Sequence, residues 1–196
     1  MDSTDSEEYE SSSSGEGWVE MYVKKFSAPV LVIVDHFFIE DMFNLYGLAE
    51  QVKDFAESLE VIRSRSYATS FSKREETLYF LIHQRYILTK SGMDAFRALL
   101  CSGVYGKCKR VQCKGFPLLP AGLSDFPHCS NTKLFCDLCT NLYEPTGDLS
   151  TVDGCAFGRT FPHLFILIHK DLFQKRKDSE KYTPRIFGFE IERNGE

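Results

Sequence analysis

The sequence predicts an α+β protein, in which an N-terminal all-helical lobe is followed by a small antiparallel β lobe. Apolar residues recur at helical spacing up to about residue 102, whereas the apolar runs after residue 103 are short and are interrupted by proline and glycine. This second part also contains two close pairs of cysteines. We expect four segments: a disordered acidic tail (1–17), the helical lobe (18–102), the cysteine-rich β lobe (103–170) and an extended C-terminal segment (171–196).

Composition allows a folded core and limits the class of protein. Of the 196 residues, 43% are hydrophobic and 14% aromatic, so the whole chain cannot be disordered. The net charge is −5, but residues 1–17 hold six acidic residues and no basic one. The remainder, with 22 acidic and 23 basic residues, is nearly neutral. A neutral body argues against non-specific nucleic-acid binding, which needs clustered positive charge.

The ends and apolar runs of the chain indicate where it works. The N-terminus is acidic and polar, unlike a secretory signal peptide. The longest apolar run, residues 28–34, is much shorter than the roughly 20 residues of a membrane-spanning helix. We therefore expect no membrane association and a location in the cytoplasm and nucleus, where thiols stay reduced and close cysteine pairs favour a metal site over a disulfide.

The first predicted helices lie between Asp35 and Ile62. Apolar residues repeat at helical spacing after Asp35, which predicts a short amphipathic helix that ends near Gly47. A second apolar stripe over residues 52–62 predicts another helix. The polar stretch 63–71 is expected to be a loop.

Two further helices are expected before the β lobe. Ser72 and Glu75 fit a capping box, which starts a helix whose apolar stripe runs over residues 78–86. Residues 89–92 are predicted to break it, and residues 93–100 to form the next helix.

Short apolar runs after residue 103 predict strands at 111–113, 133–136, 142–143 and 164–169. The chain closes with an apolar island, PRIFGFEIE (184–192), after a basic, polar stretch. It is either the final strand of the chain's own sheet or an element that fills a groove on a partner, since buried aromatic residues dominate interface energies.

Four cysteines have the spacing of a metal site. A Cys-x4-Cys pair and a Cys-x2-Cys pair are separated by 22 residues, and each pair can place two sulfurs on one tight turn. Zn²⁺ prefers four such ligands in a tetrahedron, and the metal can replace a core that is too small to be stable alone. We expect one structural Zn²⁺ per chain, in a zinc ribbon, on Cys108, Cys113, Cys136 and Cys139.

Other uses of these thiols stay open at this point. Cys129 precedes Cys136 by seven positions and could replace a ligand. A redox pair of Cys136 and Cys139 lacks the surrounding βαβ pattern. A catalytic zinc is disfavoured because it needs an open position with histidine or carboxylate ligands, and His128 is interpreted as a solvated loop residue.

We expect the chain not to be an enzyme. It has neither a phosphate-binding glycine loop nor the catalytic motifs of a kinase. His83, His163 and His169 lie in apolar surroundings and are interpreted as core or edge residues. The chain should therefore act by binding.

Several motifs, in this order, resemble the family of the casein kinase II regulatory beta subunit, from about Trp18 to Ile191. They are IEDMFNLYGL, LYFLIHQRYILTKSG, CKRVQC, LLPAGLSDFP, CDLC, DGCAFGRTFPHLF and PRIFGFEI. The resemblance implies a helical lobe followed by a zinc-ribbon lobe, a homodimer formed by the ribbons, and a heterotetramer with two catalytic kinase subunits. The dimer would stabilise these subunits and modulate their choice of protein substrates.

The resemblance also implies roles for particular residues. The four paired cysteines would be the zinc ligands, and Val111 and Leu142 would contact the second copy of the chain. The catalytic subunit would dock on Arg185, Ile186, Phe187, Phe189 and Ile191, with Leu164 as a neighbouring contact.

The chain departs from the family pattern in four places. Lys109 and Asp137 stand where the family usually has proline, and Phe187 stands where it usually has tyrosine. The family's acidic loop is replaced by a stretch that contains basic residues, namely Arg63, Arg65, Lys73 and Arg74. The departure at Lys109 concerns the dimer contact, and the departure in the loop concerns any binding of basic partners there.

Two alternatives concern the acidic tail and the function class. Thr4, Ser6 and Ser13 precede acidic residues and are candidate phosphorylation sites for the kinase partner, or the tail only adds solubility.

The alternative function is a zinc-ribbon protein that binds nucleic acid or assembles transcription complexes. It is favoured by a basic cluster near the first cysteine pair, made of Lys107, Lys109, Arg110 and Lys114.

Overall fold

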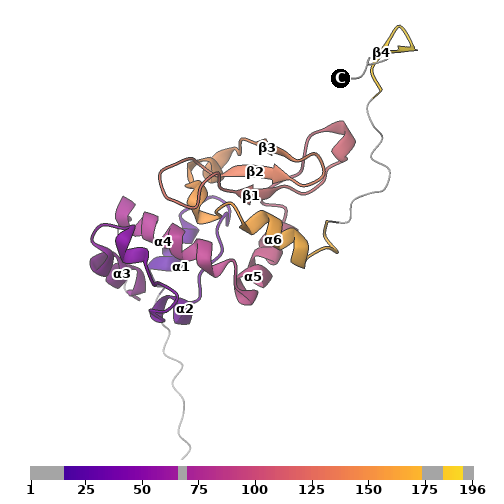
Figure 1. Cartoon of the computed structure of the whole chain (residues 1–196). Helices are drawn as coiled ribbons and strands as arrows, with labels where there is room; N and C mark the ends of the chain where they lie inside the picture. The colour runs from indigo at the N-terminus through magenta and orange to yellow at the C-terminus, as the bar shows by residue number, and fades with distance from the viewer. Residues whose placement is uncertain (1–15, 66–69, 174–182, 192–196) are drawn as a thin grey trace, which may run out of the picture.

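The computed structural model describes residues 16–65, 70–173 and 183–191 (Figure 1). Helices occupy the first part, a three-stranded antiparallel sheet follows, and a two-stranded hairpin lies near the C-terminus. The α+β prediction is confirmed. Residues 1–15 of the predicted acidic tail lie outside the described residues. No helix among the described residues combines the length and the apolar character that crossing a bilayer requires.

Helix α1 (Trp18–Lys24) was not predicted, and α2 (His36–Glu40) is shorter than predicted. The carboxylate of Asp35 accepts a hydrogen bond from the Phe37 N–H at 2.8 Å and starts α2. The helix stops at Asp41, whose backbone is extended and whose carboxylate accepts from the Phe43 N–H at 2.9 Å. Asp41 therefore offers the backbone a local turn in place of the helix that was expected to reach Gly47.

The next three helices agree with the sequence pattern, with one correction. They are α3 (Phe55–Arg63), α4 (Lys73–Tyr86) and α5 (Lys90–Cys101), and a short 3₁₀ turn, η1 (Leu48–Glu50), precedes them. Ser72 and Glu75 form the expected capping box, with the Glu75 carboxylate accepting the Ser72 N–H at 2.9 Å.

The break predicted at residues 89–92 lies instead at residues 87–89, between α4 and α5, and Gly92 belongs to the first turn of α5. The Thr89 hydroxyl caps this helix by accepting the Gly92 N–H at 3.1 Å. A Cβ at position 92 would lie 2.0 Å from the carbonyl oxygen of Tyr86. The glycine is needed because the end of α4 approaches the start of α5 too closely for a side chain.

The sheet contains β1 (Leu119–Ala121), β2 (Lys133–Cys136) and β3 (Asn141–Tyr143), in that order and antiparallel. In its register, Phe135 pairs with Leu119 on one side and Leu142 on the other. The strands at 133–136 and 142–143 are confirmed, and β1 was not predicted. The strand predicted at 111–113 is wrong, because this segment is a 3₁₀ turn, η2 (Val111–Cys113), closed by the Cys113 N–H on the Arg110 carbonyl.

The strand predicted at 164–169 is also wrong, because this segment belongs to helix α6 (Phe161–Ile168). Pro162 occupies the first turn, where its missing N–H costs nothing. Phe161 and Phe165, four residues apart, both pack on Phe96 of α5, with ring centroids 4.6 and 4.9 Å away. A run in which every residue is apolar shows no helical periodicity in the sequence. The helical spacing of Phe161 and Phe165 becomes visible only from their shared contact with Phe96.

One hydrophobic core joins the helical part to the cysteine-rich part. Helix α6 packs on β1 and, through its phenylalanines, on α5, so that it lies between the sheet and α5 in Figure 1. Two 3₁₀ turns, η3 (Gly147–Thr151) and η4 (Gly154–Ala156), complete this region, and α4 packs against η4. The two predicted lobes therefore support each other rather than folding around separate cores.

His83 of α4 lies at this junction and is fully buried, which confirms its interpretation as a core residue. Its Nδ1 is 2.7 Å from the Ala156 carbonyl oxygen, and its Nε2 accepts the Val32 N–H at 3.0 Å. A neutral ring protonated on Nδ1 satisfies both contacts. Burial lowers the pKa of His83 to about 4, so the ring stays neutral near pH 7.

The apolar island at the C-terminus folds back on itself as a hairpin of β4 (Arg185–Ile186) and β5 (Phe189–Glu190). Phe187 and Gly188 form the two-residue turn, with φ of 50° and 89°. Positive φ at both positions is what a type I′ turn requires. The segment is thus not a further strand of the three-stranded sheet, which was one of the two alternatives.

Candidate metal centre

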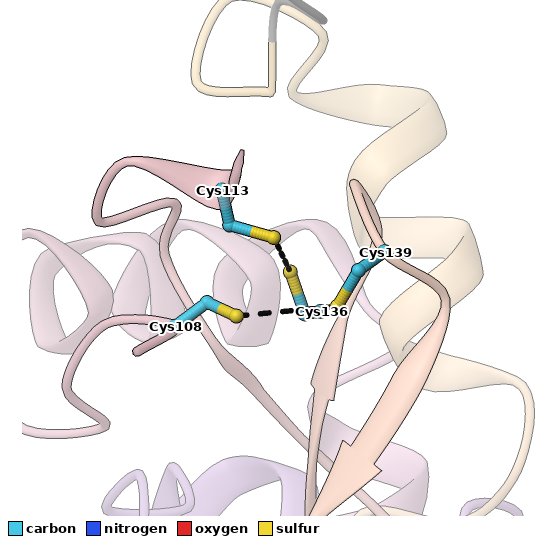
Figure 2. A group of neighbouring side chains, drawn as sticks. All are labelled: Cys108, Cys113, Cys136 and Cys139. Carbon is cyan, nitrogen blue, oxygen red and sulfur yellow. Dashed lines mark hydrogen bonds between the residues drawn. The ribbon is translucent and has the colours of Figure 1, made fainter. Parts of the chain in front are cut away.

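Four cysteine sulfurs lie within 4.8 Å of one another (Figure 2). The sulfurs of Cys113 and Cys136 are 3.9 Å apart, and so are those of Cys108 and Cys139. Four sulfurs each about 2.3 Å from a tetrahedral zinc ion are about 3.8 Å apart. The spacing therefore fits a single ion held by all four sulfurs.

Two similar turns present these cysteines. In the first, Cys108 precedes η2 and Cys113 ends it, and the Cys108 N–H donates to the Phe116 carbonyl at 2.7 Å. In the second, Cys136 ends β2 and Cys139 precedes β3. The residue after each pair has a left-handed backbone, with φ of 47° at Lys114 and 56° at Thr140. Each turn curls back tightly enough to aim both of its sulfurs at one point, as Figure 2 shows.

The close packing of the four sulfurs shifts the acidity of the thiols in different directions. Burial raises the pKa of Cys136 to about 11 and also raises the pKa of Cys113. Burial also opposes ionisation of Cys139, but hydrogen bonds from the Tyr143 hydroxyl and the Asn141 N–H outweigh it and lower its pKa to about 6. Four thiolates so close together need a positive charge among them, which a bound metal ion supplies.

The donor set fits a structural metal ion. Sulfur ligands suit zinc and other soft metals, and four of them fill a tetrahedral site without leaving a position for a substrate. Cys108, Cys113 and Cys136 are buried, and Cys139 is partly buried. The four cysteines could therefore hold a metal ion that supports the fold.

Cys129 does not replace any of the four ligands. It is exposed, lies outside the sulfur group, and has its Sγ 3.7 Å from the Pro127 carbonyl. His128 is also exposed, with its Nδ1 3.8 Å from a carboxylate oxygen of Asp153. Both side chains lie in a surface loop, as expected for His128.

The residues expected at a dimer contact are accessible. Val111, in the first cysteine turn, is 90% exposed, and Leu142, on β3, is also exposed. Leu142 lines a groove of about 800 Å³ together with Leu164 of α6. The sequence did not reveal this groove, because its two walls are separated by more than twenty residues and meet only through packing of α6 on the sheet.

The groove is lined by apolar residues, by His163 and by polar residues that include Asp125 and Arg159. Phe135 forms part of its floor, and the His163 ring lies 5.1 Å from it at 65° between the planes. Leu167 completes the α6 side and is exposed. His163 is thus an edge residue, as expected, whereas His169 is buried beside Phe165.

The expected docking residues form one exposed hairpin. Phe187, at its tip, is 97% exposed, and Ile186, Phe189 and Ile191 are exposed too. An ion pair between Arg185 and Glu190, at 2.5 Å, links the two strands. The other described parts of the chain do not cover the apolar side chains of the hairpin.

Some basic residues in place of the family's acidic loop have structural contacts. The Arg63 guanidinium donates to the carbonyls of Ile39 at 2.7 Å and Glu40 at 3.0 Å, and so caps α2. Arg74 pairs with Asp54 at 2.5 Å. Arg65 and Lys73 are exposed. The phosphorylation candidates Thr4, Ser6 and Ser13 lie outside the described residues.

The comparisons with known proteins agree with the resemblance seen in the motifs. The family model for the casein kinase II regulatory subunit matches residues 17–190. The chain is 36% identical over 182 residues to casein kinase II subunit beta of Schizosaccharomyces pombe, covering 89% of this chain and 78% of that protein. It is 34% identical over 183 residues to casein kinase II subunit beta' of Drosophila melanogaster, covering 89% and 83%. The chain therefore belongs to the casein kinase II regulatory subunit family.

Proposed function

We propose that this chain is a non-catalytic regulatory subunit that binds one structural Zn²⁺, forms a homodimer and holds two catalytic kinase subunits. The four-cysteine group carries the proposal, because its spacing and donor type suit zinc and it shapes the part of the chain that bears Val111 and Leu142. The helical lobe (18–102) and the zinc-ribbon lobe (103–170) would have separate roles, and residues 171–196 would carry the docking hairpin.

The zinc ion is proposed to hold the two cysteine turns together. The three strands around it have only three or four residues each, too few to form a stable sheet alone. Metal binding would supply part of the folding free energy. Native mass spectrometry of the purified chain should give one zinc per chain and two chains per particle. A well-folded sample without zinc contradicts the proposal.

The hairpin at 185–190 is proposed to dock the catalytic subunit. Exposed aromatic side chains on a short hairpin can fill a partner's groove, and a central aromatic contact is typically worth about 2 kcal/mol or more. Loss of such a contact weakens binding about thirtyfold. The absence of kinase motifs from the sequence supports a role through binding, which would stabilise the catalytic subunit and change the substrates that dock.

Phe189→Ala tests the docking role. Phe37→Ala is a matched control, because Phe37 is 79% exposed and Phe189 is 78% exposed, but Phe37 lies in α2. We expect Phe189→Ala to reduce co-elution with the catalytic subunit at low micromolar concentration, with zinc content and dimer unchanged. Equal co-elution of both variants and the unaltered chain contradicts the docking role.

The kinase partner is also proposed to phosphorylate the acidic tail in the cytoplasm and nucleus. Thr4 and Ser13 have an acidic residue three positions further on, and Ser6 is followed directly by two. Mass spectrometry after incubation with the holoenzyme and ATP should find phosphate on residues 1–17. An unmodified tail leaves the solubility role as the explanation.

Nucleic-acid binding remains the second candidate, because Lys107, Lys109, Arg110 and Lys114 are all exposed around the first cysteine turn. Val111 projects from the same turn, which suits a protein contact better than a phosphate backbone. Fluorescence anisotropy with duplex DNA at increasing salt separates the two. Micromolar affinity at physiological salt favours the nucleic-acid function.

A further inference from the structure

A tyrosine hydroxyl contacts two sulfurs of the metal centre. The Tyr143 Oη lies 3.2 Å from the Cys139 Sγ and 3.4 Å from the Cys108 Sγ. Tyr143 ends β3, four residues after Cys139, whereas Cys108 belongs to the other cysteine turn. One hydroxyl therefore joins a sulfur from each turn.

The direction of these hydrogen bonds follows from the protonation of the sulfurs. As a free thiol, Cys108 donates to the Tyr143 oxygen, and the hydroxyl can in turn donate to Cys139. Sulfurs that hold a metal ion are thiolates and can only accept. The phenol keeps its proton near pH 7 and has a single O–H, so with the ion bound it donates to one sulfur, and the shorter contact favours Cys139. Such hydrogen bonds orient the ligands and withdraw charge from sulfur.

The position of Tyr143 matches the most accessible ligand. Cys108, Cys113 and Cys136 are buried, whereas Cys139 is partly exposed. A chelator or electrophile would therefore reach Cys139 first. The hydroxyl of Tyr143 makes its shorter contact with this same sulfur.

We propose that Tyr143 is a positioning residue of the metal centre, whose hydroxyl donates to the Cys139 sulfur, lies beside the Cys108 sulfur and slows loss of the ion through Cys139. The proposal rests on the zinc site proposed above. It gives Tyr143, which is not one of the four cysteines, a role that the resemblance to the family did not imply.

The rate of zinc release tests it. The full chain, purified with zinc, is mixed with an excess of a chromogenic chelator, and Tyr143→Phe removes only the hydroxyl. We expect release about tenfold faster, the lower end of the 10–100-fold effects of partners of metal ligands. Tyr105→Phe is the control, because that hydroxyl donates to the Val30 carbonyl at 3.1 Å and lies outside the sulfur contacts. Its release rate should stay within about twofold of the unaltered chain.

A spectroscopic measurement separates the loss of the hydrogen bond to sulfur from a general loss of stability of the metal site. In the cobalt-substituted chain, the sulfur-to-cobalt charge-transfer band should move to lower energy in Tyr143→Phe, because the sulfur lone pairs lose a stabilising donor. Incorporation of 3-fluorotyrosine at position 143 gives a more acidic, stronger donor. It should move the band to higher energy and slow zinc release.

Each outcome supports or overturns one proposal. Equal release rates and identical bands in Tyr143→Phe and the unaltered chain overturn the role of Tyr143, while leaving the zinc site intact. An unaltered chain that binds no zinc instead overturns the proposed function. If Tyr143→Phe does not fold, the 3-fluorotyrosine chain decides, and unchanged release from it overturns the role of Tyr143.

Discussion

Mild acid should weaken the fold through the buried histidine at the junction of the two lobes. Both ring nitrogens of His83 make hydrogen bonds: the Nδ1–H donates to the Ala156 carbonyl, and Nε2 accepts from the Val32 N–H. A proton on Nε2 would place two donors against each other in a site without solvent. Replacement of His83 by glutamine removes the titration while keeping a polar side chain of similar length.

The sign and size of the effect follow from the two pKa values. The pKa of His83 falls from 6.5 in the unfolded chain to about 4 in the folded one, so only the unfolded chain binds the proton between these values. The stabilisation from the neutral ring is therefore present above pH 6.5 and is lost as the pH falls toward 4. About 2 kcal/mol should be lost between pH 7 and pH 5.

Urea unfolding at pH 7, 6 and 5 measures this loss. Trp18, the one tryptophan of the chain, is buried and reports on the core by fluorescence. His83→Gln should be less stable at pH 7 but should lose about 2 kcal/mol less than the unaltered chain on going to pH 5. Subtracting the two profiles cancels groups that titrate in both chains, including the cysteines. Parallel profiles would refute the reasoning.

Three further outcomes are expected. Gly92→Ala should lower the free energy of unfolding by about 1–3 kcal/mol, because its Cβ would meet the Tyr86 carbonyl; thermal unfolding checks this, and an unchanged midpoint contradicts it. Val111→Glu should shift the proposed dimer toward monomer in sedimentation velocity without lowering zinc content, since Val111 is 90% exposed. Its control is Val61→Glu, an exposed valine of α3, which should leave the dimer intact. Chelation of zinc should lower the unfolding temperature, and an identical temperature with and without chelator argues against a structural metal ion.

Local chemistry explains the elements that the sequence predicted well. The Ser72–Glu75 capping box, the start of a helix after Asp35 and the strand at 133–136 depend on neighbours within a few positions. The cysteine pairs belong to the same class, because each pair is set by one tight turn. Such features are readable because few residues decide them.

The wrong predictions concern segments whose neighbours lie far along the chain. Residues 164–169 are apolar throughout, and their helix is favoured by packing on Phe96, about seventy positions earlier. Gly92 was predicted to belong to the break at 89–92, but it lies in α5, where it allows a close approach to Tyr86. Short apolar runs and single glycines fit two structures equally well until the tertiary partner is known.

By itself, the sequence determined the four cysteines that could hold a metal ion, the two turns that carry them, the main helices and the family to which the chain belongs. Only the tertiary structure decided that Cys129 lies outside the sulfur group, that Leu142 and Leu164 share one groove, and that the Tyr143 hydroxyl reaches sulfurs of both turns. The reason is physical: ligand chemistry and turn geometry are local properties, whereas these contacts join segments that meet only when the sheet, α6 and the shared core pack together.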